Sequence, residues 1–305
     1  MKIVIALGGN ALGDSPFEQI KNAKFTAKMI LPIIKDGHEV VITHGNGPQV
    51  GLINLAFTEG RRINPKVYDM PLTECGAMSQ GYIGYHLQNA IQNELNLEKI
   101  DKNVISLITQ VEVSKDDEAF LNPTKPIGSF YTKEEASKMP YVMKEDAGRG
   151  FRRVVASPKP LKVLEEKEIK TLIENGFIVI SCGGGGVPVV YENGKYIGVD
   201  AVIDKDFASS KLAVDINADM LLILTAISEA KINFNKENEE VLRNVTKDEM
   251  IKYNSLGHFL SGSMKPKVEA SISFLDEIKN GTAIITSIEN AYEAIKGKKG
   301  TIIKN

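Results

Sequence analysis

The chain has 305 residues, of which 43% are hydrophobic and 25% are charged, and its formal net charge is −2. This length is enough for one large domain or two smaller ones with a substantial core. The near-neutral charge argues against a general nucleic-acid binder, because such a protein needs a basic surface to bind the phosphate backbone. We therefore expect no nucleic-acid partner.

The two cysteines, Cys75 and Cys182, provide neither a disulfide framework nor the spacing of a metal site. The apolar run at 3–7 is too short for a signal peptide, and no apolar run reaches the length of a membrane span. We expect a cytoplasmic protein with reduced thiols, no membrane association and no metal bound by clustered side chains.

The predicted elements alternate between strands and helices. Residues 3–7 are continuously apolar and end at Gly8, a pattern typical of a buried parallel strand. A helix is expected before Gly37, followed by a strand at 39–43 and a second helix from about Pro48. This alternation predicts an α/β fold.

The same pattern recurs in the second half of the chain, where we predict further strands at 177–181, 220–225, 282–287 and 301–305. Asn193-Gly194 predicts a hairpin turn. Between 113 and 157 the chain is charged and rich in Pro, Tyr and Lys, without clear periodicity. A structureless loop of that length is improbable in a compact domain, so we expect a small excursion or lid with structure of its own.

Glycine-rich turns follow three of the predicted strands, at Gly8-Gly9-Asn10, at Gly45-Asn46-Gly47 and at 183–186. In a parallel sheet, ligands bind beyond the carboxyl ends of the strands, where glycine allows backbone N–H groups to approach an anion. Any one of these turns could be an ordinary loop, but three together favour an anionic ligand such as a phosphate. The chain has no P-loop motif, and "GNGPQVG" departs from the dinucleotide-binding fingerprint by one residue.

Two lysines stand at predicted helix starts. Lys205 lies between Asp204 and Asp206, although a cation at a helix N-terminus is unfavourable by about 0.3–1 kcal/mol. The simpler explanation is a solvated turn in which Asp206 caps the helix. Lys267, in "GSMKPK", precedes a second helix, and it could equally be a solvated lysine. Two such cations suit phosphoryl transfer, which depends on positioning and charge neutralisation.

Other candidate residues have simpler explanations. His44 adjoins the second glycine turn and is expected to orient it rather than to act as an acid or base. Cys182 is expected to be a small buried residue. A solvated face, rather than an anion clamp, is favoured for the arginines of the excursion, Arg149, Arg152 and Arg153.

Eight segments spread over essentially the whole chain resemble the carbamate kinases, which are members of the amino acid kinase superfamily. In chain order they are "VIALGGNALG", "VVITHGNGPQVG", "MPLTECGAMSQGYIGYHLQ", "KPIG", "SCGGGGVPVV", "GVDAVIDKDFASSKLA", "ADMLLILTA" and "GSMKPKVEA". The combination of "GGNAL", "GNGPQVG" and "CGAMSQG" separates carbamate kinases from other members of the superfamily, whereas "PKVEA" is more widely shared.

The resemblance implies a three-layer αβα sandwich around a mainly parallel sheet, forming one domain over 1–305. An N-terminal lobe at about 1–175 would bind carbamate and include a protruding subdomain at 113–157. A C-terminal lobe at about 176–305 would bind ATP. The implied protein is a homodimer that transfers the γ-phosphate of ATP reversibly to carbamate, with Mg²⁺ held mainly by phosphates and water. In many family members the useful direction is ATP formation from carbamoyl phosphate, during arginine or agmatine catabolism.

The resemblance also implies the residues of the site. Lys205 and Lys267 would flank the transferring phosphoryl group, and Asp206 would hold both lysines. The substrate-binding residues would be Gly8, Gly9, Asn10, Gly45, Asn46, Gly47 and Lys125. The nucleotide would be bordered by Gly183, Gly184, Thr225, Ala226, Phe234 and Met264.

Two positions depart from wider patterns. Many amino acid kinases have a lysine just before the first glycine pair, where this chain and the carbamate kinases have Ala6, so Lys205 or Lys125 must supply that charge. Lys265 stands where a neutral residue is expected, and it either tunes nucleotide affinity or points to solvent.

Two other functions remain as alternatives. The first is another phosphotransferase of the superfamily, acting on a small carboxylate or phosphonate, and "CGAMSQG" argues against it. The second is a nucleotide-binding regulator without turnover, and the presence of Lys205, Asp206 and Lys267 together argues against that. The sequence leaves the physiological direction of the reaction open.

Overall fold

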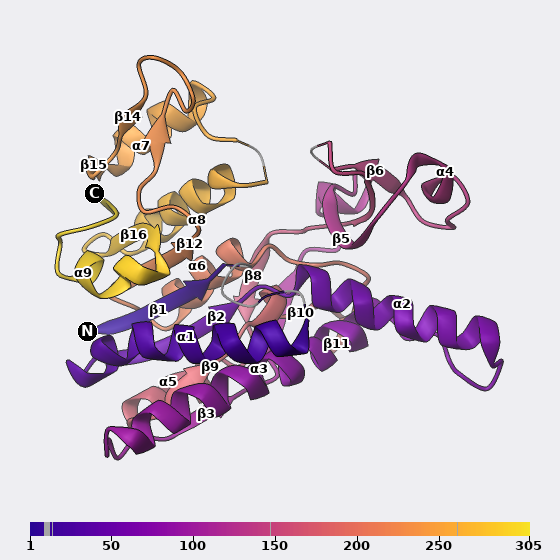
Figure 1. Ribbon diagram of the computed structural model, residues 1–305, viewed down its shortest axis with the longest axis horizontal. Helices are drawn as coiled ribbons and strands as arrows, with labels where there is room; N and C mark the ends of the chain where they lie inside the picture. Colours follow the sequence, from indigo (N-terminus) through magenta and orange to yellow (C-terminus); the bar gives the residue numbers. More distant parts are fainter. Residues whose placement is uncertain (9–12, 14, 147, 261) are drawn as a thin grey trace.

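The computed structural model describes residues 1–8, 13, 15–146, 148–260 and 262–305. At its centre, an eight-stranded sheet has helices on both faces (Figure 1). The strand order is β15 (Asn244–Thr246), β17 (Thr301–Lys304), β16 (Thr282–Ser287), β12 (Met220–Thr225), β1 (Lys2–Leu7), β2 (Glu39–His44), β9 (Ile178–Ile180) and β3 (Val104–Ser106).

The sheet is mainly parallel, as predicted. Neighbouring strands from β3 to β16 pair in parallel, whereas β16 and β17 pair antiparallel. In β1, Ile3 and Ile5 pack into one hydrophobic cluster while Val4 and Ala6 pack into another. Because a central strand is buried on both faces, its sequence is a continuous apolar run rather than an alternating one.

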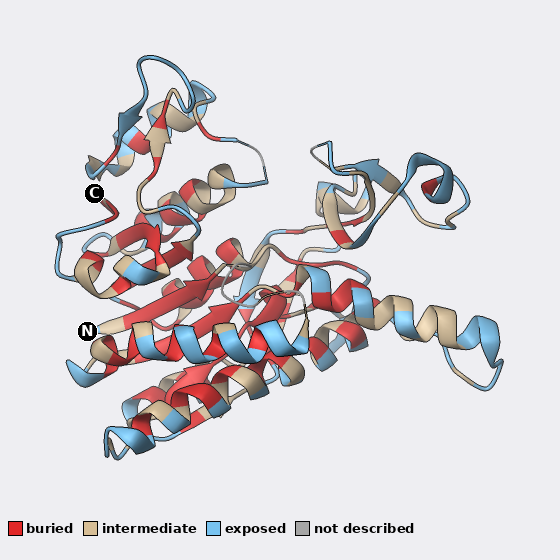
Figure 2. Ribbon diagram, viewed as in Figure 1, coloured by how far each residue is buried: buried red, intermediate tan, exposed pale blue. Residues whose placement is uncertain are grey.

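Helices complete the three-layer αβα sandwich that was predicted, and Figure 2 shows the buried strands between them. One cluster includes residues of α1 (Pro16–Lys35), α3 (Leu72–Leu97) and α9 (Ala291–Ile295). The other includes residues of α5 (Glu166–Glu174), α6 (Lys205–Asp215), α7 (Lys247–Ser255) and α8 (Met264–Glu277). Both lobes of the expected division contribute strands to this one sheet, and the boundary near residue 175 stays a prediction.

A second sheet carries the predicted hairpin. Its strand order is β11 (Lys195–Gly198), β10 (Val187–Glu192), β4 (Gln110–Val113) and β8 (Pro160–Val163). The turn between β10 and β11 has positive φ at both Asn193 (49°) and Gly194 (78°), which is the backbone conformation that the Asn-Gly pair favours. A two-stranded sheet joins β13 (Lys231–Ile232) to β14 (Glu240–Val241).

The segment expected to form an excursion has its own sheet. β4 and β8 pair antiparallel, with Val113 opposite Pro160, so residues 114–159 leave and re-enter the body at neighbouring strand ends. This protruding subdomain stands beside α2 (Gly47–Ile63) in Figure 1. It contains η2 (Glu118–Phe120), β5 (Lys125–Tyr131), α4 (Lys133–Ala136), β6 (Met143–Glu145) and β7 (Phe151–Val155), with the strand order β5-β7-β6.

Two glycines allow the subdomain to pack closely on α2. A Cβ added at Gly51 would lie 2.0 Å from Gly128 Cα, and Gly128 has φ +73°. Next to this contact, Ile127 is buried in a small cluster with Val50 and Val155. The last glycine of "GNGPQVG" therefore serves the packing of β5 against α2.

We predict that Gly51→Ala destabilises the protein by about 1–3 kcal/mol, because the new methyl group collides with backbone that no rotamer change can move. Gly60→Ala is the matched control on the same helix. Its Cβ would meet Val67 at 3.4 Å, so helix propensity should leave it neutral or slightly stabilising. Denaturant unfolding of both variants measures this, and wild-type stability in Gly51→Ala would show that the contact is not rigid.

Candidate functional site

The candidate site lies where α6 and α8 begin. Lys205 and Asp206 are the first two residues of α6, and Lys267 lies in the first turn of α8. Asp206 Oδ1 is 2.5 Å from Lys205 Nζ, and Asp206 Oδ2 is 2.9 Å from Lys267 Nζ. All three side chains are nearly buried: the exposed fraction is 4% for Asp206, 12% for Lys205 and 13% for Lys267. The structure thus brings together the three residues expected to be catalytic.

Burial and charge act in opposite directions at Asp206. Burial alone would raise the pKa of Asp206, but the two ammonium groups outweigh it and hold the pKa well below its usual value. Burial lowers the pKa of Lys205; the Asp206 charge opposes this, and the Lys267 charge adds to it. Two lysines on one carboxylate leave one excess positive charge in a water-poor site, which suits an anionic ligand.

Asp204, not Asp206, caps α6. Its side chain accepts a hydrogen bond from the backbone N–H of Asp206 at 2.9 Å. The prediction that Asp206 caps the helix was wrong. A cap at Asp206 would make Phe207 the first helical residue, but the helix begins two residues earlier, at Lys205, so the capping position falls on Asp204. Asp204 also accepts a hydrogen bond from Lys125 of β5. The sequence predicted no role for Asp204 beyond the turn.

A cavity of about 200 Å³ opens beside these charges. Gly45, Asn46 and Gly47 line it from the carboxyl end of β2, where α2 begins. Unpaired N–H groups at a helix start attract anions. Lys125 enters from the protruding subdomain, and Lys205 lies across Gly45, where an added Cβ would be 3.5 Å from its Cδ. These four expected substrate-binding residues therefore meet Lys205 and Lys267 in one cavity.

A second cavity adjoins the first. Gly8, Thr225 and Ala226 line it, and it shares Lys205 and Lys267 with the first cavity. It lies beyond the carboxyl ends of the neighbouring strands β1 and β12. A molecule that occupied both cavities would therefore lie beside both lysines.

Gly8 permits a close backbone approach between β1 and β12. A Cβ added there would lie 2.7 Å from the carbonyl oxygen of Leu224, too close for any side chain. The structure places Gly8 in the second cavity rather than in the first, where most of the other expected substrate-binding residues lie. Gly9 and Asn10, which were expected to bind substrate with it, lie outside the described residues.

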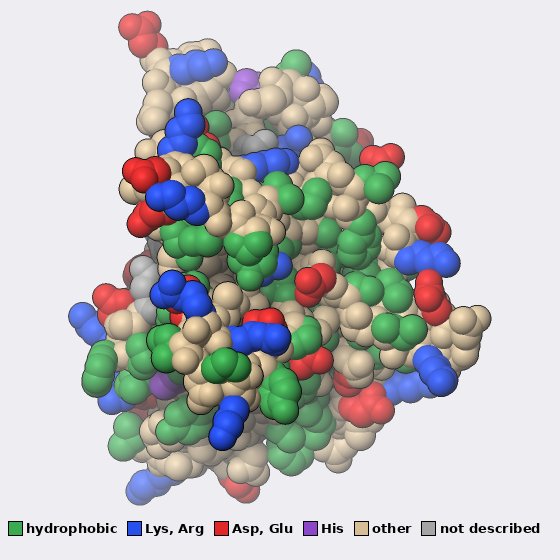
Figure 3. Space-filling view, turned by 90° about the vertical axis from the view of Figure 1, so that its right-hand side faces the viewer, with side chains coloured by type: hydrophobic (Ala, Val, Ile, Leu, Met, Phe, Trp, Pro, Cys, Tyr) green, Lys and Arg blue, Asp and Glu red, His purple; other side chains and the backbone are tan. Residues whose placement is uncertain are grey.

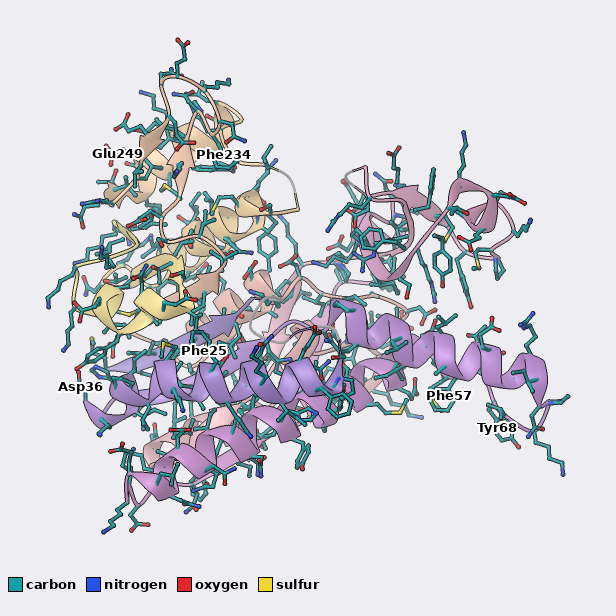
Figure 4. All side chains as sticks on the ribbon, in the orientation of Figure 1. Phe25, Asp36, Phe57, Tyr68, Phe234 and Glu249 are labelled. Atoms are coloured by element: carbon teal, nitrogen blue, oxygen red, sulfur yellow. The ribbon has the colours of Figure 1, made fainter. Side chains whose placement is uncertain are left out.

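A third, more apolar hollow adjoins the first two cavities. Phe234 and Met264 line it together with Ile227 and Phe259, and it shares Ser263 with both cavities. Figure 4 labels Phe234 on the loop between β13 and β14. The Phe234 ring is half exposed, so it could cover a flat aromatic ligand without moving aside.

Gly183 and Gly184 lie at a different end of the site from the one expected. They belong to η3 (Gly183–Gly185), where a Cβ on Gly183 would be 2.5 Å from His44 Nε2 and one on Gly184 would be 2.1 Å from Asn46 Nδ2. Gly184 lines the first cavity. Because β9 neighbours β2 in the sheet, Gly183 packs against His44 at the end of β2 and Gly184 packs against Asn46 in the turn that follows. Neither glycine borders the hollow that Phe234 lines.

Residues of "CGAMSQG" on α3 support two of the glycine turns, the one at 45–47 and the one at 183–186, through hydrogen bonds. Ser79 Oγ accepts a hydrogen bond from Asn46 Nδ2 at 2.8 Å. Gln80 donates a hydrogen bond to the Thr109 carbonyl and accepts one from the Thr109 N–H. Thr109 Oγ1 in turn accepts a hydrogen bond from the N–H of Cys182 at 3.0 Å. The sequence marked this motif as distinctive but predicted no role for Ser79 or Gln80, because their partners are far away in the chain.

The arginines of the excursion support the subdomain. The prediction of a solvated side chain was wrong for Arg152. It is 13% exposed and donates hydrogen bonds to the Gly128 carbonyl and to Asp146. Arg153 donates to Asn54 on α2 at 2.8 Å, while Arg149 is largely exposed. None of these three arginines lines the three cavities of the site.

Lys265 points away from Lys205 and Lys267. Its side chain is 43% exposed, and its Nζ lies 3.8 Å from Glu269 one turn along α8. This position agrees with the second of the two explanations for Lys265, a side chain that points to solvent. Cys182 is buried, as expected, and burial raises the pKa of its thiol.

In the described part of the chain, no three His, Cys, Asp or Glu side chains are grouped so that they could hold a metal ion. None of the described helices is both long and apolar enough to cross a membrane.

Figure 3 looks onto the end of the molecule at the right of Figure 1, and basic and acidic side chains are interspersed on that face. This face therefore carries no broad patch of a single charge.

Comparison with known proteins identifies the family. The family model described as "Amino acid kinase family" matches residues 1–287. The chain belongs to the amino acid kinase family. Among relatives in this family, the carbamate kinase of Staphylococcus haemolyticus is 53% identical over 307 residues, which cover 99% of each chain. A carbamate kinase-like protein of Escherichia coli is 52% identical over 99% of this chain and 98% of its own length.

A solved structure of this family has the same fold over the full chain. Carbamate kinase from Giardia lamblia bound to AMP-PNP superposes with a TM-score of 0.92 and 44% identity, covering 99% of this chain and 98% of the other. This amino acid kinase is therefore an enzyme of the kinase class, and these relatives are named as carbamate kinases or as carbamate kinase-like.

His44 is a buried histidine at the end of β2 in this kinase. It is buried beneath the second glycine turn, with Nδ1 2.9 Å from the carbonyl oxygen of Gly45. Burial lowers its pKa from 6.5 to about 4; the Gly45 hydrogen bond opposes this, and the Lys205 charge reinforces it. The neutral imidazole therefore supports the turn that lines the first cavity.

We predict that stability falls as the pH drops from about 6.5 to about 4, because only the unfolded chain binds a proton at His44 in this range. A folded pKa of about 4 against 6.5 corresponds to a loss of about 3 kcal/mol. His44→Asn retains a donor for Gly45 but cannot titrate, so it should lack this part of the pH dependence. Denaturant unfolding between pH 7 and pH 4 tests this, and equal slopes for variant and wild type would contradict it.

Proposed function

We propose that this enzyme transfers a phosphoryl group reversibly between ATP and carbamate, with ADP and carbamoyl phosphate as the other reactant pair. The observation that carries the proposal is that Lys205 and Lys267 line two adjoining cavities at once. A phosphoryl group passing from nucleotide to acceptor would lie where the cavities meet, and both lysines would neutralise its charge. The names of the relatives support carbamate as the acceptor.

The acceptor end requires no general base. Carbamate is already an anion whose oxygen can attack, so a well-placed His or Glu is unnecessary. Backbone N–H groups of the Gly45-Asn46-Gly47 turn would bind it, with Lys125 above. Lys205 or Lys125 would supply the charge that Ala6 lacks. Asp206 would hold Lys205 and Lys267 in place before the substrate arrives, so that little reorganisation is needed during transfer.

The nucleotide end would extend from the second cavity to the third hollow. Gly8, Thr225 and Ala226 would border the phosphates and ribose, and the apolar surfaces of Phe234 and Met264 would enclose the adenine ring. This arrangement runs the nucleotide along the carboxyl ends of β1 and β12.

We propose Mg²⁺ as the cofactor, held mainly by the ATP phosphates and water. Mg²⁺ in nucleotide sites retains several waters and is bound largely through the substrate phosphates, so it needs few side-chain ligands. When bound, Mg²⁺ supplies charge neutralisation across the phosphates. The two lysines supply the positive charge that belongs to the protein.

We propose a cytoplasmic location and ATP formation, in arginine or agmatine catabolism, as the physiological direction. The two free cysteines support the location. The direction rests on the family resemblance. Gene neighbours encoding arginine or agmatine deiminases would support it, and a requirement for the gene in carbamoyl phosphate biosynthesis would contradict it.

We predict that the purified protein forms ATP from ADP and carbamoyl phosphate in the presence of Mg²⁺. Coupled detection of ATP measures this directly, with acetyl phosphate as the alternative phosphoryl donor. Activity with acetyl phosphate alone would indicate a related phosphotransferase. Nucleotide binding without any turnover would indicate a regulator.

In the same assay, Lys205→Ala and Lys267→Ala should each lower kcat roughly 100- to 1,000-fold, as expected for the loss of one preorganised charge, about 2.7–4 kcal/mol. Lys265→Ala is the matched control, because this neighbouring lysine points to solvent, and its kcat should stay close to wild type. A catalytic-lysine variant within about tenfold of wild type would refute that residue's role.

We also propose a homodimer, as the resemblance implies. Exposed apolar side chains on the outer surface of α3, among them Met78 and Tyr85, support a contact with a second copy. The molar mass measured by light scattering during gel filtration should be twice the chain mass of 33.4 kDa. The chain mass itself at micromolar concentration would contradict the proposal.

A further inference from the structure

Asp204 makes two separate contacts with its two carboxylate oxygens. Oδ1 accepts from the backbone N–H of Asp206 at 2.9 Å, and Oδ2 accepts from Lys125 Nζ. The Lys125 and Asp204 side chains are 29% and 18% exposed, and both line the first cavity together with Lys205. A single carboxylate thus joins the start of α6 to the protruding subdomain.

The backbone near Lys125 is already held by packing. Gly128 lies against Gly51 of α2, and Ile127 is buried in the cluster that includes Val50. These contacts place the main chain of β5, but a lysine side chain has four rotatable bonds and about 2 kcal/mol of rotamer entropy. The contact that restrains the Lys125 ammonium group is the one with Asp204.

We propose that Asp204 is a positioning residue, which holds the Lys125 ammonium group at the cavity while it fixes the N-terminus of α6 that carries Lys205. The pairing also has an electrostatic consequence. An unpaired carboxylate at this place would repel an anionic substrate, whereas the ion pair with Lys125 neutralises it. The proposal rests on the proposed function only where kinetics are used to test it.

Two substitutions separate the two contacts. Asp204→Asn retains an oxygen that can cap α6, because Asn caps helices about as well as Asp, but it loses the negative charge that faces Lys125. Asp204→Ala loses both contacts. We expect the melting temperature of Asp204→Ala to be about 2–4 °C below that of Asp204→Asn, the difference expected for a lost cap.

The reactivity of Lys125 tests the ion pair without any need for activity. Competitive labelling with an amine reagent, followed by peptide mass spectrometry, should show Lys125 reacting roughly two- to fivefold faster in Asp204→Asn, as expected when a partly exposed ion pair is lost. Glu134→Gln is the control, because Glu134 pairs with Lys138 on the surface of the same subdomain. It should leave the labelling of Lys125 unchanged. An unchanged rate in Asp204→Asn would overturn the proposal.

Kinetics test whether Asp204 acts through Lys125. Asp204→Asn should lower kcat for ATP formation roughly tenfold while the KM for ADP stays within about twofold, and in a Lys125→Met background it should add less than about twofold. Losses that multiply instead would show that Asp204 acts independently of Lys125. If the wild-type protein itself forms no ATP, the proposed function fails, and the labelling result still decides the assignment of Asp204.

Discussion

The ion-pair cluster of Asp206 with Lys205 and Lys267 is the constraint on which the rest of the site depends. The two ammonium groups lie 2.5 and 2.9 Å from the same carboxylate. Without that carboxylate they would repel each other strongly in this buried place. The packing of α6 beside α8 keeps the three groups together, so helix packing here also serves an electrostatic purpose. Lys205 occupies a helix start at some cost to local stability, which is common at functional sites.

Sheet topology brings the remaining parts to this cluster. β1 lies between β2 and β12, and parallel strands present their carboxyl ends at the same edge. The turn after β2 therefore lies close to the end of β12 although the two are far apart in the sequence. Charge stays concentrated at this edge, because the buried strands that end there, β1, β2 and β12, are almost entirely apolar.

Local signals account for what could be predicted. Continuous apolar runs marked the central strands, and Lys205 and Lys267 stood out because lysine is unfavourable at a helix start. Contacts between distant segments had no such signal: Lys125 and Asp204 are 79 residues apart, and Gly184 meets Asn46 only because β9 neighbours β2. The subdomain strands escaped notice because they are partly exposed and their burial does not alternate regularly along the strand, as in β5.

The way the subdomain is attached also has an evolutionary meaning. Residues 114–159 connect two antiparallel strands whose ends are neighbours, so in topological terms the subdomain is a long insertion in the loop of a β-hairpin. Insertions at such a place leave the pairing of the flanking strands intact. The part of the chain that carries Lys125 could therefore change in length and sequence while the sheet, Lys205 and Lys267 stayed as they are.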